Sequence, residues 1–172
     1  MLERLDTVGL WGVTVTLGYL LTGFTGSLGL QGEIVNYGLI TMWLVLMAIP
    51  AYSSLKKYRK DGNWRNLNVI WSVAMIIGVL ANYSGQLAVS GDILRYTYYQ
   101  KWFVLPGILF ACTAWKINGF SRKVYAAATV LNLGIGLSLS TIPVFQTYAF
   151  YIAALIQGVP MLVDWCRFNI ME

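Results

Sequence analysis

Histidine is absent from this chain, and cysteine is nearly so. Without histidine there is no imidazole for acid–base catalysis or for ordinary haem ligation. The two cysteines, Cys112 and Cys166, form no CxxC motif and are too few to build a structural zinc site. We expect both to be small, buried apolar side chains. The chain is therefore expected to hold neither a metal nor a cofactor.

Charged residues are also scarce, at 11% of the chain, whereas apolar residues make up 58%. Soluble domains usually have roughly 25% charged and roughly 45–50% apolar residues. A soluble protein needs more polar surface than this composition supplies. The net charge of +5 lies beside apolar runs, so anionic lipid suits it better than nucleic acid does. The composition predicts an integral membrane protein with the lipid bilayer as its first partner.

Six long apolar segments follow one another along the 172 residues. Each is close to the roughly 20 residues needed to cross about 30 Å of hydrocarbon. The stretch from Val124 to Val163 has no charge and is twice the length of one span, so it must contain two helices joined by a turn. The sequence predicts a single all-α domain, residues 1–172, built as a bundle of six transmembrane helices. The expected spans are 8–30, 34–55, 67–89, 96–115, 124–143 and 148–163.

Lysine and arginine are distributed unevenly between the two sides of this predicted bundle. Only Arg95 and Lys101 fall on one side, and the others lie on the side of both termini. Cytoplasmic loops retain Lys and Arg, so both termini are expected in the cytoplasm. The first segment follows two acids, Glu3 and Asp6, and is too long for the apolar core of a cleaved signal peptide. We expect an uncleaved protein of the plasma (inner) membrane.

Lys101 is the charged residue expected to lie deepest in the membrane. Counting back from Trp115 at the inner boundary, its Cα lies about 9 Å below the outer edge of a ~30 Å core. Its side chain either snorkels to the surface or points into an outer vestibule. Arg95, Tyr98, Tyr99 and Trp102 share one helical face, because their spacing is i, i+3, i+4 and i+7. Such a face anchors a helix at the interface, or it holds a small anionic or aromatic solute.

Polar side chains also interrupt the apolar segments. Unpaired amides in hydrocarbon are unfavourable, so these side chains must meet each other, water or a ligand. Interhelical hydrogen bonds are one interpretation, and a polar pocket open to the outside is the other. The outer acid Asp92 is a candidate partner of Lys101. The full set of candidate ligand-binding residues is Asn82, Gln86, Asp92, Arg95, Tyr98, Tyr99, Lys101, Trp102, Asn132 and Gln157.

The first apolar segment is rich in glycine, which lets helix backbones approach closely. Its glycines are Gly9, Gly12, Gly18, Gly23, Gly26 and Gly29. This pattern indicates a packing helix at the centre of the bundle or at a contact between subunits. The second interpretation includes a homo-oligomer and a larger membrane complex.

These patterns favour a small-solute binding or transport protein with an outward-facing vestibule between the third and sixth spans. The first alternative is a non-catalytic accessory or scaffold subunit that docks through the glycine-rich first span. A membrane-embedded lipid-modifying enzyme is disfavoured, because the sequence contains no catalytic constellation. The chain is thus expected not to be an enzyme.

Overall fold

The computed structural model describes the backbone of residues 2–30, 32–57, 62–88, 91–139 and 141–170, and this part of the chain is all-helical. Side chains are described for residues 7–30, 32, 34–56, 66–80, 100–139 and 141–167. The all-α class expected from the sequence is confirmed. The helices are α1 (Leu2–Ser27), α2 (Glu33–Lys57), α3 (Gly62–Ala88), α4 (Gly91–Lys116), α5 (Gly119–Ser138), α6 (Pro143–Thr147), α7 (Ala149–Ala153), the π-helix η1 (Ala154–Gly158) and α8 (Val159–Ile170).

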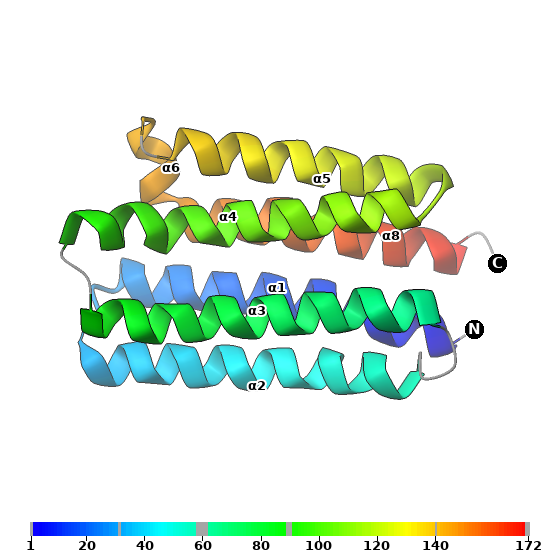
Figure 1. Cartoon of the computed structure of the whole chain (residues 1–172), viewed down its shortest axis with the longest axis horizontal. Helices are drawn as coiled ribbons and strands as arrows, with labels where there is room; N and C mark the ends of the chain where they lie inside the picture. The colour runs from blue at the N-terminus through cyan, green and yellow to red at the C-terminus, as the bar shows by residue number, and fades with distance from the viewer. Residues whose placement is uncertain (1, 31, 58–61, 89–90, 140, 171–172) are drawn as a thin grey trace.

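The long helices lie side by side along one axis (Figure 1). Helix α1 leads away from the end where the chain begins, α2 returns to it, and α3, α4 and α5 continue the alternation. The segment from α7 through η1 to α8 returns last, so both termini lie at the same end. We call this end the terminal end. It is where α2 and α4 finish and where α3 and α5 begin.

Several helices continue beyond the apolar segments of the sequence. Helix α2 runs to Lys57 and α4 to Lys116, because lysine is a good helix former and need not leave the helix. Helix α4 also starts earlier than the apolar run, at Gly91. In the uncharged stretch α5 ends at Ser138, and the short helix α6 follows with Pro143 in its first turn, where the missing N–H costs nothing.

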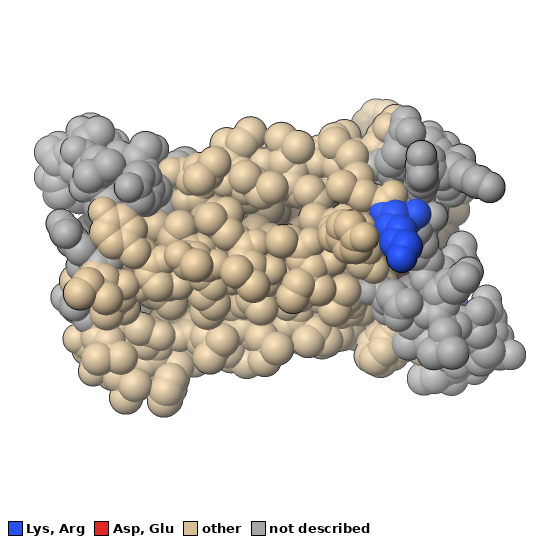
Figure 2. Space-filling view, turned by 90° about the horizontal axis from the view of Figure 1, so that it is seen from below, with Lys and Arg blue, Asp and Glu red and all other residues tan. Residues whose placement is uncertain are grey.

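The outside of the bundle is apolar. Among the residues that the structure describes, three helical stretches are long and apolar enough to cross a membrane, namely Thr7–Ser27, Ile34–Lys56 and Ala149–Arg167. Large apolar side chains such as Val130 and Leu137 are more than 70% exposed. Figure 2 shows one face whose central part is uncharged, with the Lys and Arg side chains visible there at the terminal end. Continuous apolar surface of this kind is typical of contact with lipid. These features fit a membrane protein.

Helix α1 is the packing centre of one half of the bundle, in contact with α2, α7, η1 and α8. At Gly18 a Cβ atom would lie 2.6 Å from the ring of Trp43. Four glycines of this helix are closely covered by side chains of neighbouring helices: Gly9, Gly12, Gly18 and Gly23. Gly26 and Gly29, by contrast, have open space around them. Most of the small residues of α1 therefore serve contacts within the chain.

Candidate functional site

Three long helical segments of the bundle continue past a proline, Pro50 in α2, Pro106 in α4 and Pro160 in α8, and each proline removes a backbone hydrogen-bond donor. Pro106 in α4 has no N–H for the carbonyl of Trp102, and Pro160 in α8 has none for the carbonyl of Ile156. Just before Pro160 the chain widens into the π-helix η1, a feature frequent at functional sites. In hydrocarbon a freed carbonyl needs another donor. The side chains that supply these donors are the first part of the candidate site.

Asn132 and Gln157, which we call the amide pair, provide these donors. Gln157 Nε2 donates to the carbonyl of Trp102 at 2.7 Å and to Asn132 Oδ1 at 2.9 Å. Asn132 Nδ2 donates to the carbonyl of Ile156 at 3.4 Å and to that of Ala128 at 2.8 Å. Both side chains are fully buried. The amide pair thus joins α4, α5 and η1 at two of the three places where a proline interrupts the helical bonding, those of Pro106 and Pro160.

Three aromatic rings pack beside the amide pair. Tyr19 meets Trp43 edge-on at 4.9 Å between ring centroids, and Trp43 stacks on Trp102 at 5.8 Å. The hydroxyl of Tyr19 donates to the carbonyl of Trp102 at 3.4 Å, and Trp43 Nε1 donates to Thr22 Oγ1 at 3.0 Å. All three rings are buried. We call Tyr19, Trp43 and Trp102 the aromatic layer; it connects α1, α2 and α4.

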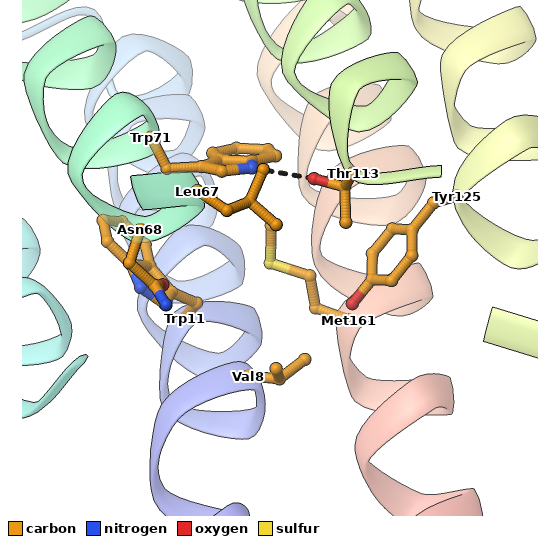
Figure 3. Close-up of a pocket in the computed structure, with 8 residues that line it drawn as sticks. All are labelled: Val8, Trp11, Leu67, Asn68, Trp71, Thr113, Tyr125 and Met161. Atoms are coloured by element: carbon orange, nitrogen blue, oxygen red, sulfur yellow. Dashed lines mark hydrogen bonds between the residues drawn. The ribbon is translucent and has the colours of Figure 1, made fainter. Parts of the chain in front are cut away.

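A cavity of about 40 Å³ lies nearer the terminal end (Figure 3). One water needs roughly 10–15 Å³ measured in this way, so the space suits a solute of a few heavy atoms. Trp11 of its wall and Tyr19 of the aromatic layer are roughly 12 Å apart along α1, at 1.5 Å rise per residue. The lining residues come from α1, α3, α4, α5 and α8: Val8, Trp11, Leu67, Asn68, Trp71, Thr113, Tyr125 and Met161.

The polar groups of two tryptophans and a threonine on this wall are bonded to protein atoms. Trp11 Nε1 donates to Ser54 Oγ at 3.3 Å. Trp71 Nε1 donates to Thr113 Oγ1 at 3.0 Å, the dashed line in Figure 3. Thr113 Oγ1 in turn donates to the carbonyl of Leu109 at 2.9 Å. The two indole rings are held in place by these bonds, and their N–H groups are engaged.

A buried carboxylate lies behind the cavity wall. Tyr125 donates its phenolic hydrogen to Asp164 Oδ2 at 3.0 Å, and Ser121 donates to Asp164 Oδ1. Asp164 is only 3% exposed. The guanidinium of Arg167, one turn further along α8, lies 4.0 Å from the centre of the Phe120 ring. Among the side chains that the structure describes, no three Cys, Asp or Glu residues gather to form a metal site.

The structure brings three of the residues singled out in the sequence into one cluster: Trp102, Asn132 and Gln157. Their described contacts are with each other, with Tyr19 and Trp43, with the freed carbonyls and with the carbonyl of Ala128. Lys101, beside Trp102 in α4, is half-buried. The other candidates lie outside the described side chains, and their part in an outer vestibule stays a prediction: Asn82, Gln86, Asp92, Arg95, Tyr98 and Tyr99.

The expectation that Cys112 and Cys166 are buried is wrong, since both are exposed on the outside of the bundle. Sequence reasoning also missed the rest of the aromatic layer and the whole cavity. Tyr19 and Trp43 lie in the middle of apolar segments, away from the interfaces where Tyr and Trp usually gather, and that position was a usable signal. The bond between Tyr125 and Asp164 had no comparable signal. It joins residues 39 positions apart on different helices.

No protein-family model matches this sequence, and no curated protein or solved structure matches it either. Its function is therefore argued from the geometry of the bundle.

Proposed function

We propose that this chain is a six-span membrane protein, with both termini in the cytoplasm, that binds and transports a small solute. The observation that carries this proposal is the cavity lined by aromatic rings and hydroxyls inside a bundle with an apolar exterior. Small-molecule sites are hollows with mostly apolar walls and a few placed polar groups. The cavity belongs to the cytoplasmic half in this arrangement. The predicted outward-facing vestibule near Lys101 is the route by which the same carrier exchanges solute with the outside.

The length and charge of the helices support the six spans and their orientation. Helices α3, α4 and α5 have 27, 26 and 20 residues, which at 1.5 Å per residue is about 30–40 Å. That length is sufficient for the roughly 30 Å hydrocarbon core. Lys56 and Lys116, at the ends of α2 and α4, both belong to the terminal end. Retention of positive charge on the cytoplasmic side then orients the bundle.

The aromatic layer and the amide pair support a carrier with one closed side. They place packed rings and hydrogen bonds between α1, α2, α4, α5 and η1, further from the termini than the cavity. A membrane helix can bend at a proline, because the backbone bond is already missing there. Pro106 in α4 and Pro160, which follows η1, are two such places. Movement there would move Trp102 and Gln157 and open the layer.

An accessory subunit that docks through α1 is the less supported alternative. Four of the glycines that would make such a contact are covered by neighbouring helices of the same chain, for example Gly12 by Leu162 and Gly18 by Trp43. Among the glycines of α1, Gly26 alone has nothing within 4 Å of the position that a Cβ would take.

Orientation is tested by thiol labelling of single-cysteine variants in a chain whose Cys112 and Cys166 are replaced by alanine. Asn118→Cys lies in the exposed connection between α4 and α5, and Thr147→Cys lies in the exposed helix α6. With an impermeant thiol reagent added to intact cells, Thr147→Cys is expected to react and Asn118→Cys to resist. The reverse pattern would contradict the orientation. Reaction of both variants in opened membranes is the control.

Access to the cavity is tested in the same cysteine-free chain. Thr113→Cys places a thiol on the cavity wall, whereas Ala128→Cys places one at a fully buried position outside it. In inside-out vesicles we expect a small thiol reagent to modify Thr113→Cys at least tenfold faster than Ala128→Cys. The reason is that the first thiol borders empty space and the second borders packed side chains. Equal, slow rates would mean that the cavity has no cytoplasmic access.

A further inference from the structure

Five lining side chains carry hydrogen-bond donors; Trp11, Trp71, Thr113 and Tyr125 donate theirs to protein atoms, and the fifth is the amide of Asn68. The N–H groups of Trp11 and Trp71 donate to Ser54 and Thr113. The hydroxyl hydrogens of Thr113 and Tyr125 are likewise donated to other protein atoms, Leu109 O and Asp164 Oδ2. What these four side chains can offer a solute is oxygen lone pairs and ring π-electrons. An anion needs donors from its site, so this part of the wall is a poor place for one.

The same wall is electron-rich. Trp71 meets Phe110 edge-on at 5.1 Å between centroids, and Phe110 stacks on Tyr125 at 5.7 Å, so the rings form a connected group. The faces of Trp and Tyr attract cations, more strongly when water is excluded. Behind Tyr125, the carboxylate of Asp164 is 3% exposed and adds negative charge, and the guanidinium of Arg167, one turn along α8, offsets part of it. Ring faces and carboxylate together favour a positively charged solute.

We propose that the cavity binds a small ammonium-type cation, such as ammonium or methylammonium. The proposal rests on the proposed function, since it names the solute class of the same cavity. A cavity of about 40 Å³ limits the solute to a few heavy atoms. An ammonium group brings its own donors for the oxygens of Thr113 and Tyr125, and its charge meets the ring faces. The vestibule near Lys101 was expected to hold an anionic or aromatic solute; with a cationic solute it is an access route and not the binding site.

The test is titration of the full chain in nanodiscs with methylammonium chloride, acetamide and sodium acetate at constant ionic strength. These probes are cationic, neutral and anionic solutes of similar size. Two of the lining residues are tryptophans, so intrinsic fluorescence reports occupancy. We expect a saturable change with methylammonium and a response at least tenfold weaker with acetamide and with acetate.

Three variants locate the site. Thr113→Val keeps the shape of the side chain and removes a wall oxygen, and Asp164→Asn removes the charge behind the wall. Each is expected to weaken methylammonium binding about tenfold, the usual effect of losing one charge-assisted contact. Trp115→Leu is the control, because Trp115 is 86% exposed and lies outside the cavity. Its affinity for methylammonium is expected to equal that of the parent.

The outcomes separate this proposal from the one on which it rests. If acetamide or acetate binds saturably and methylammonium does not, the proposal of a cationic solute is wrong, but the proposal of a solute-binding cavity is not contradicted. No saturable response to any probe, together with an unreactive Thr113→Cys, would overturn both. Parent-like affinity in Thr113→Val and Asp164→Asn would place methylammonium elsewhere and also overturn the cation site. Should Asp164→Asn fail to fold, Thr113→Val alone decides.

Discussion

Gly158→Ala is expected to lower the free energy of unfolding by about 2 kcal/mol, within the roughly 1–3 kcal/mol range of overpacked cores. A Cβ atom at Gly158 would overlap Thr16 Oγ1 and lie 3.3 Å from the carbonyl of Gly12. Thr16 Oγ1 cannot turn aside freely, because it donates to that carbonyl at 2.7 Å. Helices α1 and η1 would have to separate at their closest approach.

A second substitution tests this cause directly. Thr16→Ala removes the obstructing oxygen, so Gly158→Ala is expected to cost much less in a Thr16→Ala background. Gly134→Ala is the matched control, since nothing lies within 4 Å of the position that its Cβ would take. It should be neutral, or stabilising by up to ~1 kcal/mol through helix propensity. Unfolding by denaturing detergent measures all four chains, and equal effects of Gly158→Ala and Gly134→Ala would refute the contact.

Gln157→Leu is the second substitution with a large expected effect, a loss of about 2 kcal/mol. It removes the donor shared by the carbonyl of Trp102 and Asn132 Oδ1 and leaves both acceptors buried. A buried polar group left without a hydrogen-bond partner costs about 1–3 kcal/mol. Hydrogen bonds between membrane helices average only about 0.6 kcal/mol in double-mutant cycles. The Tyr19 hydroxyl, 3.4 Å from the carbonyl of Trp102, compensates in part.

The role of the proline can be separated from that of the glutamine by a double-mutant cycle. Pro106→Ala restores an N–H that can bond the carbonyl of Trp102 within α4. The loss caused by Gln157→Leu is therefore expected to shrink in a Pro106→Ala background. Gln146→Leu is the control, because Gln146 is only half-buried and water can replace its bond to the carbonyl of Leu139. Additive effects of Pro106→Ala and Gln157→Leu would mean that the freed carbonyl does not depend on Gln157.

The amide pair shows how far the sequence could predict the candidate site. That Asn132 and Gln157 lie within apolar segments was enough to predict that each needs a partner. The identity of the partner was not predictable, because it depends on how α5 and η1 are rotated about their own axes. The prolines were visible too, but which donors reach the freed carbonyls depends on neighbouring helices.

The sequence by itself determined the all-α class, the apolar exterior and the gathering of basic residues at one end, because each follows from local composition and from the length of uninterrupted apolar runs. Only the tertiary structure decided where the empty space lies. The described cavity is near the terminal end, between Trp11, Trp71 and Tyr125, whereas the sequence directed attention to Lys101. A cavity is the space that packed side chains leave unfilled, so it depends on the relative rotation and spacing of five helices. No local pattern in the chain records those quantities.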